Sequence, residues 1–186
     1  MDRRRSIGLA GAGSLLLLQS AFPSKVSPGK ETGWMEGFKD AFNTRWEGLR
    51  THTFEVFGAM PDRQFDFQPT KEVMSFAKLF SHIGHSLDIY AEILDGAEKI
   101  EEPKSKEKET LIRYVQTRFE RFEAAFYQLN TSDLYNPKHV MKTMDGEVSF
   151  SDYDILMLAY NHTVHHKGQA TTYLRLQGIT PPAYRF

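Results

Sequence analysis

The sequence contains no cysteine in its 186 residues. Disulfide bonds, zinc fingers, iron–sulfur clusters and cysteine nucleophiles are therefore excluded, and any thiol chemistry would need a thiol supplied from outside. An excess of charge of one sign is also missing, because 23 Lys and Arg residues face 24 Asp and Glu residues. Nucleic-acid binding needs a concentrated basic surface, so no nucleic-acid partner is expected.

Long hydrophobic runs are missing as well. The apolar run at residues 7–18 follows three arginines and is too short to cross a bilayer, which is the layout of a secretory signal. We therefore predict a signal peptide over residues 1–22, a linker over 23–33 and one domain over 34–186. The mature chain is expected to have no membrane span and to be exported to the periplasm or beyond. A poor match to the cleavage-site rule leaves a cytoplasmic protein with a short tail as the alternative.

Several catalytic signatures are absent from the sequence. It has no Gly-x-Ser-x-Gly elbow for a serine nucleophile and no glycine-rich loop for phosphate. The zincin motif His-Glu-x-x-His fails because Thr163 stands where the glutamate would be. No histidine has a glutamate three residues before it, so a di-iron carboxylate bundle is also excluded.

Four segments carry apolar residues at spacings of three and four, which is typical of one face of an α-helix. Residues 130–148 are expected to form a loop, in which a hairpin is possible but not required. Four long amphipathic helices predict an all-α fold, a four-helix bundle preceded by the signal-like extension. The predicted helices span residues 34–60, 75–95 and 106–129, with a fourth that begins at a capping sequence in 149–152 and ends near Gly178.

Histidine is the residue type that could carry chemistry. His162 and His166 are four residues apart, so they lie on one helix face together with Ile155 and Tyr173, which indicates that this face points inward. A pair of interior imidazoles suits a divalent metal ion. The alternative is two partly exposed histidines near a helix end.

The second predicted helix offers a third imidazole. His82 lies about 100° from the centre of that helix's apolar face and can reach a neighbouring helix, whereas His85 is expected to face solvent. Three imidazoles from two helices would leave a coordination position open for water or substrate. Elsewhere, His52 is expected to be a partly buried structural residue and His139 a surface residue. Catalytic residues are not identified, although Tyr160 and Tyr173 flank the site.

The segment His162-Thr-Val-His165-His166-Lys167-Gly168-Gln169 resembles the C-terminal signature of the DinB/YfiT-like superfamily, as does the segment that continues to Pro182. Residues 67–70 and 75–83 are similar to the loop and second helix of that family. The resemblance implies a four-helix bundle, often a homodimer, that holds a divalent metal ion through His82, His162 and His166. It also implies that His165 is not a ligand, that Gly168 allows close helix approach, and that Gln169 orients a ligand or water.

The resemblance leaves the reaction open. One hypothesis is a metal-dependent enzyme, either a hydrolase or a thiol-dependent transferase, that binds zinc or nickel and acts on an unknown small-molecule substrate. A second is a non-catalytic metal-binding or stress-associated bundle in which the ion is structural. A third is an interaction bundle without metal. No organic cofactor site is predicted.

Overall fold

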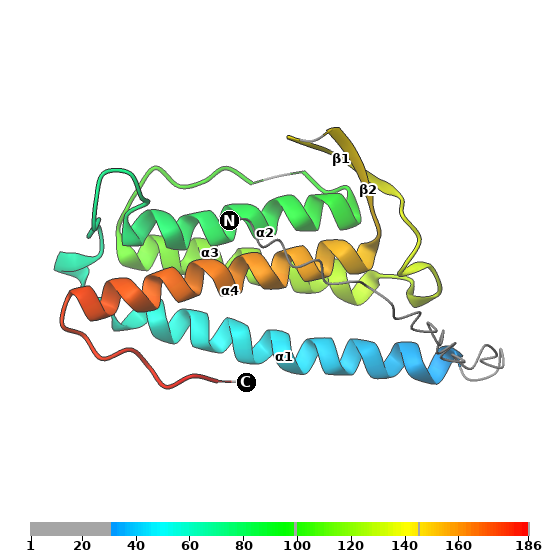
Figure 1. Ribbon diagram of the computed structural model, residues 1–186, viewed down its shortest axis with the longest axis horizontal. Helices are drawn as coiled ribbons and strands as arrows, with labels where there is room; N and C mark the ends of the chain where they lie inside the picture. Colours follow the sequence, from blue (N-terminus) through cyan, green and yellow to red (C-terminus); the bar gives the residue numbers. More distant parts are fainter. Residues whose placement is uncertain (1–30, 99, 145, 186) are drawn as a thin grey trace, which may run out of the picture.

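The structure, a computed structural model, describes residues 31–98, 100–144 and 146–185. Its main feature is a bundle of four long helices, which confirms the predicted four-helix fold (Figure 1). Two short 3-10 helices, η2 at Asp62–Gln64 and η3 at Thr131–Asp133, lie in the connections. The helices are α1 at Glu31–Ala59, α2 at Phe76–Asp95, α3 at Lys108–Gln128 and α4 at Asp152–Leu176.

Local capping explains where α2 and α4 begin and where α2 ends. The Ser75 side chain accepts a hydrogen bond from the backbone N–H of Lys78 at the start of α2. The helix ends at Gly96, whose φ of 72° is in the left-handed region that favours glycine. A reciprocal capping box between Ser151 and Asp154 starts α4, and its N-cap residue Ser151 lies in the capping sequence predicted at residues 149–152.

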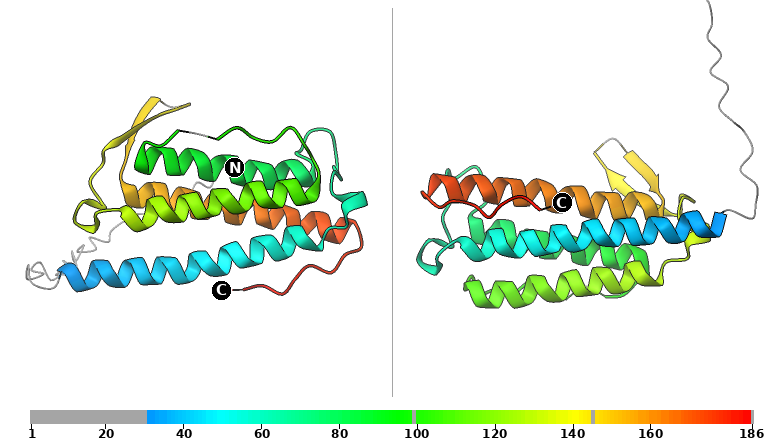
Figure 2. Two further views of the ribbon diagram at one scale, coloured as in Figure 1. Left: turned by 180° about the vertical axis from the view of Figure 1, so that it is seen from behind. Right: turned by 90° about the horizontal axis from the view of Figure 1, so that it is seen from below.

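The chain path is not a simple up-and-down bundle. α2 and α3 run in the same direction, and α1 and α4 run the opposite way (Figures 1 and 2). Parallel neighbours cannot be joined by a short turn, so residues 96–107 cross back over the outside of the bundle. Several contacts hold this crossing segment, among them the Ile100 N–H, which donates to Asp88 at 2.9 Å, and the ion pair of Lys78 with Glu102 at 2.9 Å.

The core is rich in aromatic rings. Trp46 of α1 packs on Phe122 of α3 with ring centroids 4.6 Å apart, and Phe57 of α1 stacks on Phe80 of α2 at 4.1 Å. All four of these side chains are at most 1% exposed. Aromatic contacts of this kind add to the free energy of burial. They fix α1 against α3 and α2, and leave the α2–α4 seam free for polar side chains.

The hairpin that the sequence analysis left open within residues 130–148 is present, and it extends to Phe150. Strand β1, His139–Thr143, pairs antiparallel with β2, Gly146–Phe150. His139 is not a plain surface residue, since its Nε2 lies 2.7 Å from a carboxylate oxygen of Asp152, which is 1% exposed. The Lys138 ammonium lies 2.7 Å from the other oxygen. The hairpin therefore rests on the buried carboxylate at the start of α4, a contact that alternation of apolar residues does not reveal.

The predicted signal peptide, residues 1–22, and most of the predicted linker lie outside the described residues. Helix α1 begins at Glu31, slightly before the expected start of the domain. Within the described part of the chain, no helix combines the length and the apolar character needed to cross a bilayer.

Candidate metal centre

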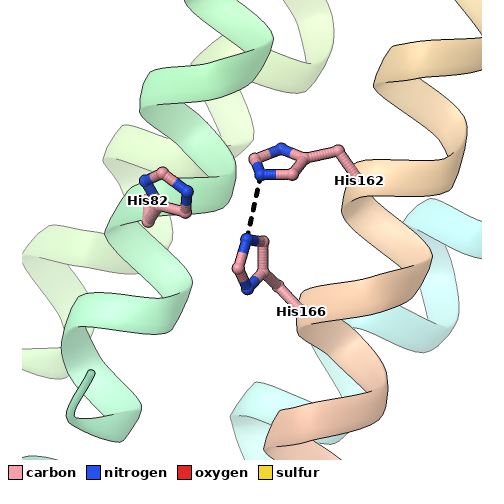
Figure 3. A group of neighbouring side chains, drawn as sticks. All are labelled: His82, His162 and His166. Carbon is pink, nitrogen blue, oxygen red and sulfur yellow. Dashed lines mark hydrogen bonds between the residues drawn. The ribbon is translucent and has the colours of Figure 1, made fainter. Parts of the chain in front are cut away.

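The three histidines singled out from the sequence meet between α2 and α4. His82 comes from α2, and His162 and His166 from successive turns of α4 (Figure 3). One ring nitrogen of each lies within 4.8 Å of the others. The ring of His82 is 5.0 Å from that of His162 and 4.7 Å from that of His166, each nearly perpendicular. The structure thus brings the three predicted ligands into one group.

The helix α4 faces inward at this point, as its pattern predicts. Ile155 and Tyr173, on the same face as His162 and His166, are 0% and 7% exposed. The rings of His162 and His166 therefore point towards α2 rather than towards water (Figure 3). The i, i+4 spacing places them one turn apart, which lets both nitrogens approach one point.

Hydrogen bonds fix how the α4 imidazoles present their nitrogens. The Oε1 atom of Gln169 can only accept, and it lies 2.8 Å from Nδ1 of His166. Nδ1 therefore carries the hydrogen, and Nε2 of His166 presents a lone pair. That Nε2 lies 2.9 Å from Nε2 of His162, so the two atoms face each other and can share one proton or one cation. The contact of Gln169 with His166 is consistent with the orienting role that the family resemblance implies.

All three imidazoles are held in the neutral form. Burial, followed by the charges of His166 and His82, lowers the pKa of His162 to about 4. Burial is also the main cause that lowers the pKa of His82 and of His166 below the usual 6.5. Neutral imidazoles have free lone pairs at pH 7, so this donor set fits a divalent ion such as zinc or nickel.

The rim of the group carries further polar side chains. His165 is exposed, and its Nε2 lies 3.2 Å from Nε2 of Gln169. The sequence analysis expected His85 to face solvent, but the structure shows it half-buried. It lies within electrostatic range of His82 and Glu102. The segment that crosses from α2 to α3 covers this side of α2, and helix periodicity alone does not show that cover.

A tyrosine of α2 that the sequence analysis does not name lies beside the group. The ring of Tyr90 is 6.2 Å from that of His162, and burial raises its pKa. The two tyrosines named as flanking the site are engaged elsewhere: the hydroxyl of Tyr173 donates to the Met74 carbonyl at 3.1 Å, and Tyr160 lies against Phe42. Tyr90 reaches His162 because α2 and α4 are antiparallel, which places the last turns of α2 beside this part of α4. The sequence alone does not show this alignment.

The two residues after His166 face other directions. Lys167 is only 6% exposed and points towards α1, where its ammonium lies over the Tyr184 ring. Gly168 faces open space, since a Cβ there would have no atom within 4 Å. The expectation that Gly168 allows close helix approach is therefore wrong. The glycine that serves this purpose is Gly84 of α2, where a Cβ would lie 2.9 Å from the Tyr114 ring.

Two solved structures show the same fold. A DinB-like protein from Bacillus subtilis superposes with a TM-score of 0.59 at 22% identity, covering 78% of this chain and 97% of that one. A DinB-like protein from Bacillus cereus gives a TM-score of 0.62 at 18% identity, covering 77% and 95%. No curated protein matches the sequence. The sequence profile of the DinB family matches residues 35–186, nearly the whole described chain, and the protein therefore belongs to the DinB family.

Proposed function

We propose that this protein is a metal-dependent enzyme that holds one divalent ion through His82, His162 and His166. The observation that carries the proposal is the convergence of three neutral imidazole nitrogens within 4.8 Å of one another, from two helices. Such a convergence of buried polar rings is costly unless a common partner satisfies them. Zinc and nickel are the ions that best suit an all-imidazole donor set.

Three protein ligands leave at least one coordination position for another molecule, as in catalytic sites and unlike closed structural ones. No Asp or Glu of the described residues belongs to the group, so no carboxylate fills that position. When bound, the ion would supply Lewis acidity that activates a water molecule or a thiol near neutral pH. Hydrolysis and thiol transfer both fit this chemistry, and the thiol would come from outside because the chain has no cysteine.

The chain's own residues have defined tasks in this proposal. Gln169 keeps the hydrogen of His166 on Nδ1 and so directs Nε2 towards the ion. Tyr90 packs at the edge of the group and excludes water from the His162 side. Lys78, His85 and Glu102 lie on the α2 side of the group, where they could contact a substrate that enters from that side.

A structural ion in a non-catalytic bundle is the second candidate, favoured by the burial of His166, which is 5% exposed. We also propose a homodimer and, from the predicted signal peptide, export. The substrate of the proposed enzyme is a small molecule rather than a nucleic acid, since the charge of the chain is balanced.

Elemental analysis of the purified chain tests the metal centre. We expect about one ion per chain, loss of that ion in His82→Ala, His162→Ala and His166→Ala, and retention in the matched variant His165→Ala. A chain that stays metal-free after zinc and nickel are added, while the variants fold and melt normally, would contradict the proposal.

Cobalt substitution then separates a catalytic from a structural ion. If the coordination shell is open, azide or a small thiol changes the visible spectrum of the cobalt-loaded chain. A spectrum that neither ligand changes favours the structural alternative.

A further inference from the structure

After α4 the chain turns back on itself and covers the seam between α1 and α4. Gly178, at a φ of 72°, reverses the chain, and the Ile179 N–H donates to the Leu174 carbonyl at 2.9 Å. From there residues 179–185, here called the C-terminal strap, run back along the bundle between α4 and α1 (Figure 2, right).

The last described residues of the strap make its firmest contacts. Arg185 forms two hydrogen bonds with the carboxylate of Glu55 on α1, at 2.8 and 2.6 Å. The ring of Tyr184 meets the ring of His52 edge-on, with centroids 6.0 Å apart. The ammonium of Lys167 on α4 lies 5.6 Å from the centre of the same Tyr184 ring. The strap thus joins α1 to α4 above two basic side chains.

His52 is nearly enclosed beneath the strap, more deeply than the sequence analysis expected. It is 4% exposed, and neither ring nitrogen makes a hydrogen bond of normal geometry, although the Pro182 backbone lies close enough to favour the charged ring. A buried imidazole without such bonds has little to stabilise a positive charge. The closed strap therefore favours the neutral form of His52 over the charged form.

The charged groups that face His52 add to this effect. Burial and then the charge of Lys167 lower its pKa, and Arg185 of the strap acts in the same direction. The Pro182 carbonyl and Glu55 oppose them, and the net pKa of His52 stays below 6.5. The groups come from α1, from α4 and from the strap, so the balance changes when the strap leaves.

We propose that the C-terminal strap is a pH-sensitive latch, which opens on acidification because His52 takes up a proton that the closed arrangement disfavours. Opening returns His52 to water and to the ordinary affinity of an imidazole for protons. The open state then binds more protons than the closed state, so lowering the pH shifts the equilibrium towards it. One linked proton raises the open-to-closed ratio by up to about tenfold per pH unit below 6.5.

The ion pair of the strap does not respond in the same pH range. Its hydrogen bonds to Arg185 lower the pKa of Glu55 below the usual 4.5, so the pair keeps its charges while His52 titrates. Between pH 6.5 and 5 the imidazole is thus the group of this cluster that changes. Two neighbouring contacts near the end of the strap therefore differ in their response: the Arg185–Glu55 pair is unchanged over this pH range, whereas the contact of Tyr184 with His52 is weakened when His52 takes up a proton.

A spin label can measure this motion, because the chain has no cysteine of its own. A nitroxide on Ala183→Cys, an exposed position of the strap, reports its mobility at pH 7.5 and pH 5.0 in the full chain. We expect the mobile fraction to rise severalfold at pH 5.0. In a His52→Phe background, or His52→Gln if the first does not fold, we expect no rise.

Two controls identify the source of any change. A label on Gln116→Cys, exposed on α3, should keep the same spectrum at both pH values if the bundle stays folded. Arg185→Ala should make the Ala183→Cys label mobile already at pH 7.5. Equal mobility at both pH values in the wild-type background, or an equal rise in the His52 variants, would overturn the proposal.

Discussion

Gln169 is the residue that decides how His166 presents its second ring nitrogen. Its oxygen accepts from Nδ1 of His166 at 2.8 Å, whereas its nitrogen faces exposed His165 at 3.2 Å. We expect Gln169→Leu to weaken zinc binding by about 10- to 100-fold, because the imidazole loses its fixed tautomer and orientation. A competition titration with a chromophoric chelator measures this. His165→Ala should change affinity little, and an unchanged affinity in Gln169→Leu would refute the orienting role.

The sequence predicts the three histidines of the site, but it does not predict the side chains that surround them. His162 and His166 follow from their helix spacing and His82 from its angle to the apolar face of its helix, and the family resemblance implies the same three residues. Tyr90 could not be found this way, because its contact with His162 depends on how α2 and α4 are aligned. The enclosure of His52 depends on a segment more than 100 residues away and has no local signature.

At the scale of helices, α2 and α3 approach closely at one glycine. A Cβ on Gly84 would lie 2.9 Å from a ring carbon of Tyr114 and 3.1 Å from Val115. We expect Gly84→Ala to lower the free energy of unfolding by about 1–3 kcal/mol, since the core must shift to accept the methyl group. Gly168→Ala is the matched control, and in open space on α4 it should raise stability by up to about 1 kcal/mol. Urea unfolding measures both, and equal effects would contradict the packing argument.

The hairpin depends on one buried carboxylate at the start of α4. Asp152 is 1% exposed and lies 2.7 Å from both Lys138 and His139. We expect Asp152→Asn to cost about 1–3 kcal/mol of stability, because hydrogen bonds to a charged, buried acceptor are lost. It should also speed hydrogen exchange in β1 and β2. Asp133→Asn, which removes an exposed partner of Lys138, should leave that exchange unchanged; faster exchange there would show that Asp152 is not the anchor.

The helix boundaries could be predicted within a few residues because local chemistry sets them. Ser75, Gly96 and Ser151 each carry a cap that is visible in the sequence. The hairpin could only be left open as a possibility, because its strands are mostly exposed and apolar and polar residues alternate only weakly along them. The hairpin is held by contacts with Asp152. Contacts of this kind, between separate elements, produce no periodic pattern of apolar residues in the sequence.

For the whole molecule, the histidines make the metal-free protein sensitive to acid. The pKa values of His52, His82, His162 and His166 are all lower in the folded chain than the usual 6.5, that of His162 at about 4. The unfolded chain therefore binds more protons between pH 6.5 and about 4. The free energy of unfolding should fall as the pH falls through this range and stay level above it. Urea unfolding at pH 7.5, 6.0 and 5.0 measures this, and equal stability at pH 7.5 and 5.0 would contradict it.

Bound metal should raise the free energy of unfolding, whereas acid lowers it. An ion that binds only the folded chain stabilises it by about 2.7 kcal/mol at 100 times its dissociation constant. We expect zinc to raise the melting temperature of the wild-type chain at pH 7.5 and to have no such effect on His162→Ala. The same rise in both proteins would show that zinc binds elsewhere.

The order in which the chain is made has a consequence for metal loading. The ligands come from α2 and α4, so two of the three leave the ribosome about 80 residues after the first. The crossing segment, α3 and the hairpin must all be synthesised before the three imidazoles can meet. A nascent chain therefore cannot capture an ion while α2 alone has emerged. If the proposed site binds metal, the ion that it takes up is set by the ions present where α4 docks on α2.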